Sequence, residues 1–160
     1  MTTEISVRPM TVSDLSDVHD IQCAGYAEVF HEPVSMFHEI VSIYDKLSYV
    51  AVKDLKIVGY LLSQPSDEYR DDFVEGVWPI SGDEECVYLH DLCVYPDYHK
   101  QGIARLLFSR FCEQAKNEGF KKIIGVCVQD SALFWQKRGF TIGDSYPYNG
   151  ESGYYMKKEL

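Results

Sequence analysis

The segment from Val94 to Leu107 has the residue types of a phosphate-binding turn. A proline turn leads through Gly102 into a strongly amphipathic helix, and a helix start leaves backbone N–H groups unpaired and carries a partial positive charge. Gly102 lets the backbone approach a ligand closely, while Lys100 and Arg105 add cationic side chains. The spacing matches neither a P-loop nor the GxGxxG dinucleotide fingerprint. An ordinary strand-to-helix connection is the alternative for this segment taken alone.

The stretch before this turn, Cys86–Val94, carries a histidine and an aspartate side by side. His90 has an ordinary pKa of about 6.5, which suits proton transfer near neutral pH. Strand alternation places His90 on the face of Tyr88 and Leu92. Asp91 is expected on the opposite face, unless a bulge reverses the alternation locally. A histidine hydrogen-bonded within the sheet is the alternative to a functional one.

Hydrophobic periodicity predicts the elements that position these residues: a mixed sheet with helices on its faces, an α/β (α+β) fold. The order of elements is β-α-α-β-β-β-α-β-α-β-β. The expected strands are 5–7, 48–52, 56–63, 86–94, 121–128, 140–145 and 153–158, and the expected helices begin near Thr11, Pro33, Gly102 and Ser131.

Length and charge exclude several classes of protein. The 160 residues, 46% of them hydrophobic, can bury one sizeable core, and without repeats or linkers residues 1–160 are expected to form a single domain. The formal net charge of −10 argues against nucleic acid or an anionic membrane as a partner, because both need a basic face.

Targeting signals and metal-binding patterns are not found in the sequence. No apolar run is long enough to span a bilayer, and the first residues have no signal-peptide core, so a cytoplasmic location is expected. The 5 cysteines are widely spaced with no CxxC pair, which indicates reduced core residues rather than disulfides or a metal site.

Three separate stretches resemble the GNAT N-acetyltransferase superfamily. Pro96–Leu107 is similar to the acyl-CoA pyrophosphate-binding motif, Q/R-x-x-G-x-G/A, although a histidine stands at its first position. Val7–Leu15 resembles the family's first strand and helix, and Ala132–Phe140 resembles its late FYxxxGF element. The resemblance covers nearly the whole chain and implies a twisted mixed sheet whose central fourth and fifth strands splay apart around the pantetheine arm of acetyl-CoA.

The resemblance also implies roles for individual residues. A bulged end of the fourth strand would offer backbone groups of Leu92, Cys93 and Val94 to pantetheine, and the Leu92 N–H would polarise the thioester carbonyl. The residues implied to hold the pyrophosphate are His99, Lys100, Gln101, Gly102, Ile103, Ala104 and Arg105. His99 replaces a fixed cation but can still donate to a phosphate.

The resemblance implies direct attack of a neutral amine on acetyl-CoA, which requires a base. His90 is the leading candidate because LHDLCV is similar to the LHALAV stretch of arylalkylamine N-acetyltransferases, and Asp91 is the alternative. The family's usual acid is a tyrosine, where this chain has Trp135, and an indole N–H cannot serve. Trp135 is therefore expected to form a wall beside the thioester. The acid could instead be water, His90 or one of three phenols, which are Tyr146, Tyr148 and Tyr154.

The segment Gln64–Glu85 is strongly acidic, with Arg70 as its only base and aromatic residues between the acids. In the family this connection often borders the acceptor cleft, where carboxylates and aromatic walls would suit a cationic amine. The alternative is a solvated loop. The acids are Asp67, Glu68, Asp71, Asp72, Glu75, Asp83, Glu84 and Glu85, and the aromatic residues include Tyr69, Phe73 and Trp78.

These features predict an acetyl-CoA-dependent N-acetyltransferase whose acceptor is a small amine, an arylalkylamine or a polyamine. A protein lysine or N-terminus is the alternative acceptor, and a non-catalytic acyl-CoA-binding regulatory protein is the alternative class. Acetyl-CoA would be a cosubstrate, no metal is expected, and a homodimer remains open.

Overall fold

The computed structural model describes residues 4–128, 130–148 and 150–160. The strands are β1 (Ser6–Pro9), β2 (Tyr49–Lys53), β3 (Lys56–Ser66), β4 (Cys86–Val94), β5 (Lys122–Cys127), β6 (Thr141–Ser145) and β7 (Tyr154–Glu159). The helices are α1 (Leu15–Gly25), α2 (Val34–Ile43), α3 (Ile103–Asn117) and α4 (Ala132–Gln136), with short 3-10 turns at Val12–Asp14, Glu28–Phe30, Phe73–Glu75 and Pro96–Tyr98.

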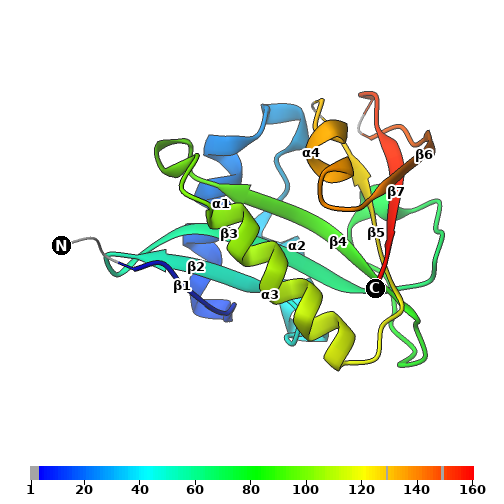
Figure 1. Ribbon diagram of the computed structural model, residues 1–160, viewed down its shortest axis with the longest axis horizontal. Coiled ribbons are helices and arrows are strands. Elements are labelled where there is room, and N and C mark those ends of the chain that lie inside the picture. The colour runs from blue at the N-terminus through cyan, green and yellow to red at the C-terminus, as the bar shows by residue number, and fades with distance from the viewer. Residues whose placement is uncertain (1–3, 129, 149) are drawn as a thin grey trace.

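The strands of the described residues form one sheet in the order β1-β2-β3-β4-β5-β7-β6 (Figure 1). Neighbouring strands are antiparallel except β4 and β5, which run parallel. α1 and α2 pack on one face around Tyr60 and Leu62, whereas α3 packs on the other face in a core that includes Leu61 and Trp135. The prediction of a mixed sheet with flanking helices is confirmed.

A β-bulge in β4 decides which side chains share a face. Leu62 pairs with Asp91 and Ser63 pairs with Leu89, so His90 is an extra residue without a partner on β3. The bulge turns Asp91 toward the face of Tyr60, whose hydroxyl donates to its carboxylate. The simple alternation that separates His90 from Asp91 is therefore wrong, because one extra residue inverts the strand's two-residue period.

The same bulge moves Leu92 away from the face that alternation assigns to it. Leu92 packs against the α3 core, whereas Cys93 joins the core under α1 and α2. The resemblance implies a bulge at the end of β4, over Leu92, Cys93 and Val94. The register instead places the irregularity at His90, while Leu92 to Val94 remain paired with β3.

β4 and β5 splay apart soon after they meet. They pair only from Cys86 with Lys122 to Tyr88 with Ile124, and the divergence follows at Gly125. A Cβ added to Gly125 would lie 3.2 Å from the Leu89 carbonyl oxygen and 2.8 Å from the Met156 Cε. Glycine therefore permits a close approach just where the strands separate, and the predicted splay of the central strands is confirmed.

The acidic segment 64–85 does not form a wall of the main cavity. Its aromatic residues Phe73 and Trp78 are buried, and the Phe73 ring stacks on Tyr88 at 4.5 Å between centroids. Some of its charges are paired on the surface: Arg70 binds Asp72 at 2.8 Å, and Glu68 binds Lys122 at 2.7 Å. The expectation that aromatic residues of this segment line the acceptor cleft is wrong for Phe73 and Trp78, because their rings pack in a core against Tyr88 of β4.

Replacing Gly125 with Val should destabilise the protein by about 1–3 kcal/mol, since the side chain would meet the Leu89 backbone and overpack the site. Urea unfolding measures the change. Gly143→Val is the matched control, because Gly143 is exposed on β6 and its nearest contact for a Cβ is an ordinary 3.4 Å. Equal losses in the two variants would contradict the importance of this close approach.

Candidate active site

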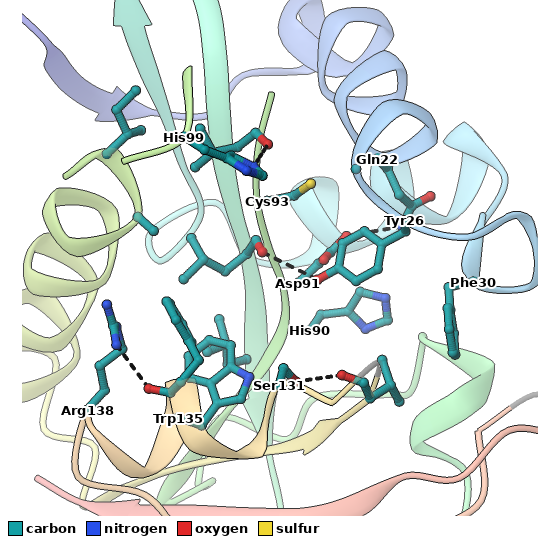
Figure 2. A pocket seen from close by; sticks show the side chains of 18 of the residues that line it. Gln22, Tyr26, Phe30, His90, Asp91, Cys93, His99, Ser131, Trp135 and Arg138 are labelled. Carbon is teal, nitrogen blue, oxygen red and sulfur yellow. Dashed lines mark hydrogen bonds between the residues drawn. The ribbon is translucent and has the colours of Figure 1, made fainter. Parts of the chain in front are cut away.

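A cavity of about 680 Å³ occupies the splay between β4 and β5. α1, β4, the turn before α3 and α4 all contribute to its walls (Figure 2). The predicted site residues that line it are His90, Asp91, Leu92, Cys93, Val94, His99, Lys100, Gly102, Ile103, Ala104, Arg105 and Trp135. Gln101 does not line the cavity; its side chain is exposed and accepts a hydrogen bond from the Lys53 Nζ at 2.7 Å.

One end of the cavity is built to attract an anion. Gly102 is the N-cap of α3 with a φ of +79°, and it offers no capping side chain to the first amides of the helix. Lys100 also has a positive φ, +66°, so the turn is held in a conformation that ordinary residues rarely adopt. Unpaired amides at a helix start together with the nearby charges of Lys100 and Arg105 suit a phosphate.

His99 is anchored to β4 rather than free. Its Nε2 lies 2.9 Å from the Val94 carbonyl oxygen. Because a carbonyl can only accept, this nitrogen carries the hydrogen. The remaining nitrogen, Nδ1, is then an acceptor in the neutral imidazole, so a neutral His99 has no free ring N–H to offer a phosphate.

The opposite end of the cavity contains a carboxylate that the sequence analysis missed, Glu32. It is buried between the turn Glu28–Phe30 and α2, and its oxygens lie 3.0 and 3.1 Å from His90 Nε2. Gln22 donates to Glu32 at 3.1 Å and accepts its backbone N–H at 2.8 Å. The Tyr148 hydroxyl donates to Glu32 at 3.2 Å. Glu32 therefore joins α1, β4 and the β6–β7 connection.

The ion pair shifts both partners toward their charged forms. Burial disfavours charge on His90, but the charge and hydrogen bond of Glu32 outweigh it and raise the His90 pKa above its usual value. Burial would likewise raise the pKa of Glu32, but His90, Gln22 and Tyr148 together lower it. His90 Nε2 must donate to the carboxylate, and His90 Nδ1 has no hydrogen-bond partner among the described residues. When His90 is neutral, Nδ1 carries a free lone pair.

Asp91 is a second buried carboxylate at this end. It accepts hydrogen bonds from the Tyr60 hydroxyl and, at 3.1 Å, from Gln22 Nε2. Burial raises its pKa, partly offset by Tyr60 and by the charge of His90. Glu32 and Asp91 thus face one imidazole, which leaves this part of the cavity short of positive charge.

Aromatic side chains close this end of the cavity. Tyr26 donates to the Leu92 carbonyl at 3.3 Å, and Phe30 contacts both Tyr26 and Tyr148, with ring centroids 6.4 and 5.8 Å away. Figure 2 shows Tyr26 and Phe30 on the side of His90, with Trp135 on the opposite side. Trp135 lines the cavity and is buried against Phe108 and Phe140.

Of the three phenols considered as acids, Tyr148 alone lines the cavity among the described residues. Burial raises its pKa, so it remains a hydrogen-bond donor. Tyr146 donates instead to the Arg70 carbonyl at 2.7 Å, and Tyr154 is exposed on β7.

Glu32 lies 58 residues before His90 in the chain, and no local pattern connects the two. The only sequence signal is an acid directly before Pro33, at a helix start, in a connection that also contains Glu28 and His31. Such an acid is ordinarily explained by the helix dipole alone.

Solved structures with the same fold cover nearly the whole chain. The loading GNATL domain of CurA from Lyngbya majuscula superposes with a TM-score of 0.85 at 15% identity, covering 98% of each chain. The ribosomal-protein-S18-alanine N-acetyltransferase from Escherichia coli gives 0.75 at 16%, covering 98% of this chain and 94% of that one. The polyamine N-acetyltransferase of Drosophila melanogaster gives 0.76 at 15%, covering 98% and 100%. These identities define a shared fold.

Family membership follows from the sequence itself. Residues 15–140 match the model of the acetyltransferase (GNAT) family, whereas no curated protein matches the sequence of the chain. The chain therefore belongs to the GNAT acetyltransferase family, and the prediction of an acetyl-CoA-dependent N-acetyltransferase is confirmed at that level.

Among the described residues, no helix is both long and apolar enough to cross a membrane.

Replacing Glu32 with Gln should lower the His90 pKa, because burial disfavours the charged imidazole and only the charge of Asp91 then remains to oppose it. Titration of the histidine ring resonances by NMR measures it. Glu28→Gln, an exposed acid of the same connection, is the control and should leave the His90 pKa in place. An unchanged pKa in the Glu32 variant would contradict the ion pair.

Proposed function

We propose that the protein transfers the acetyl group of acetyl-CoA directly to a small cationic primary amine, with His90 as the general base. The observation that carries this proposal is the buried His90–Glu32 pair: His90 is a cavity-lining residue, and the Nδ1 of its fully buried side chain has no hydrogen-bond partner among the described residues. A carboxylate that holds one imidazole nitrogen and leaves the other free is the usual arrangement for proton transfer.

The reaction balances with groups that line the cavity. The neutral amine attacks the thioester carbonyl, a C–N bond forms, and the Leu92 N–H stabilises the oxyanion, as the family resemblance implies. The His90 side chain is fully buried, so its Nδ1 takes the proton that the amine loses through an intervening water. The C–S bond then breaks and CoA leaves as a thiolate, which needs no dedicated acid because a thiol has a pKa of about 8.5. The imidazolium can later return its proton to the thiolate.

The closed aromatic end supports a small acceptor over a protein lysine or N-terminus. Tyr148 from the β6–β7 connection contacts Phe30 and Glu32 from the α1–α2 connection. A peptide would need an open path between these two connections, whereas a small amine needs only the enclosed space. The His90–Glu32 pair also favours an enzyme over a non-catalytic acyl-CoA-binding protein, because His90 Nδ1 is left without a partner among the described residues, which a purely structural ion pair does not require.

An assay of CoA thiol release with acetyl-CoA and a panel of amines and peptides tests the function. His90→Gln should lower kcat by about 10²–10⁴-fold, while His38→Gln, exposed on α2, should not. The raised His90 pKa means that the wild-type rate should increase with pH through a midpoint above about 6.5, as the imidazole loses its proton. Binding of acetyl-CoA without turnover on any amine or peptide would overturn the proposal.

Asp91 gives a test of the acceptor's charge. We expect the wild type to prefer 1,4-diaminobutane to butylamine, because the second ammonium can pair with this carboxylate. Asp91→Asn should remove about 10-fold or more of that preference in kcat/KM, the size of a charged hydrogen bond. Asp20→Asn, exposed on α1, is the control. A preference that persists in the Asp91 variant would contradict this role of Asp91, and no preference in the wild type would argue for an arylalkylamine held by Tyr26, Phe30 and Tyr148 instead.

A further inference from the structure

Two arginines from different elements lie at the cationic end of the cavity without an anion to neutralise them. Arg105 is in the first turn of α3, and Arg138 follows the end of α4; both line the cavity. Among the described residues neither forms a salt bridge. The resemblance to the family points to Arg105 but not to Arg138.

The Arg138 guanidinium is held in place before any ligand binds. Its Cζ lies 3.5 Å from the centroid of the Phe134 ring, and Nη1 donates to the Phe134 carbonyl at 3.0 Å. Figure 2 shows this side chain extending from the end of α4 along the cavity. A guanidinium has several N–H donors in a fixed plane, so those not bound to Phe134 remain available, and little conformational freedom would be lost on binding.

The two positive charges interact unfavourably in the protein alone. Burial and the charge of Arg105 both lower the pKa of Arg138, which reports a cation that is partly desolvated and close to another cation. A bound phosphate would reverse this, because it would supply opposite charge to both guanidiniums.

We infer that Arg138, together with Arg105, forms a phosphate-binding site on the α4 wall, which recognises the nucleotide end of the acyl donor separately from the backbone amides at the start of α3. The inference rests on the proposed use of acetyl-CoA. Two phosphate sources share this chemistry, the 3′-phosphate and the diphosphate of CoA. In both cases the site makes the enzyme select a nucleotide-bearing donor over pantetheine alone.

Calorimetric titration of the protein without an acceptor tests this site, with CoA, dephospho-CoA and pantetheine as ligands. Arg138→Gln should weaken CoA binding by about 10- to 100-fold, the range for a charge-assisted hydrogen bond. Lys137→Gln is the matched control, because it removes the same charge from the exposed neighbouring residue. Arg138→Lys keeps the positive charge but lacks the planar set of guanidinium N–H donors, and it should recover part of the affinity. Thermal melts check that each variant is folded.

The three ligands separate the possible outcomes. A loss for CoA alone assigns Arg138 to the 3′-phosphate, and equal losses for CoA and dephospho-CoA assign it to the diphosphate. An equal loss for pantetheine, or wild-type affinity for CoA in Arg138→Gln, would overturn the inference while leaving acetyl transfer intact. CoA binding that depends on Arg138 without any turnover would overturn only the proposed function, whereas a wild type that does not bind CoA would overturn both.

Discussion

The buried ion pair between Glu32 and His90 shares one face of β4 with Asp91 because β4 carries one residue more than β3 can pair. His90 is that residue, and without the bulge it would not share the side of Asp91. The bulge lets two consecutive polar side chains of a buried strand reach partners on α1 and the α1–α2 connection, through Gln22 and Glu32. Buried charges need such partners, so the local irregularity and the arrangement of these segments depend on each other.

Charge is distributed unevenly along the cavity, and each end lacks groups of opposite charge to balance its own. Glu32 and Asp91 exceed the positive charge of His90 at one end, while Arg105 and Arg138 have no described carboxylate partner at the other. Like charges held close together lower the stability of the folded protein. An anionic cosubstrate at one end and a cationic acceptor at the other would offset the repulsion between like charges at both ends. The cationic end is local, so the molecule as a whole can be acidic and still bind a phosphate-bearing cosubstrate.

Local patterns predicted the phosphate-binding turn well and the acceptor end poorly. Gly102, Lys100 and Arg105 are close together in the chain, so their spacing on a strand-turn-helix was sufficient to place them in the cavity. Glu32, Gln22, Tyr26 and Tyr148 come from three separate segments, and nothing in their own neighbourhoods indicates a shared site. Phe73 and Trp78 were assigned to the cavity because aromatic residues suit both a binding wall and a core; packing against Tyr88 used them for the core.

The sequence was sufficient to predict the order of strands and helices, the cationic turn and the family. Each of these depends on residues close together in the chain and on hydrophobic repeats that can be recognised without knowing which strands pair. The face of Asp91, the carboxylate that pairs with His90 and the arginine that joins Arg105 required the folded chain. A strand's alternation can be inverted by one residue of register, and ion pairs form between side chains that only the packing of distant segments brings within about 3 Å.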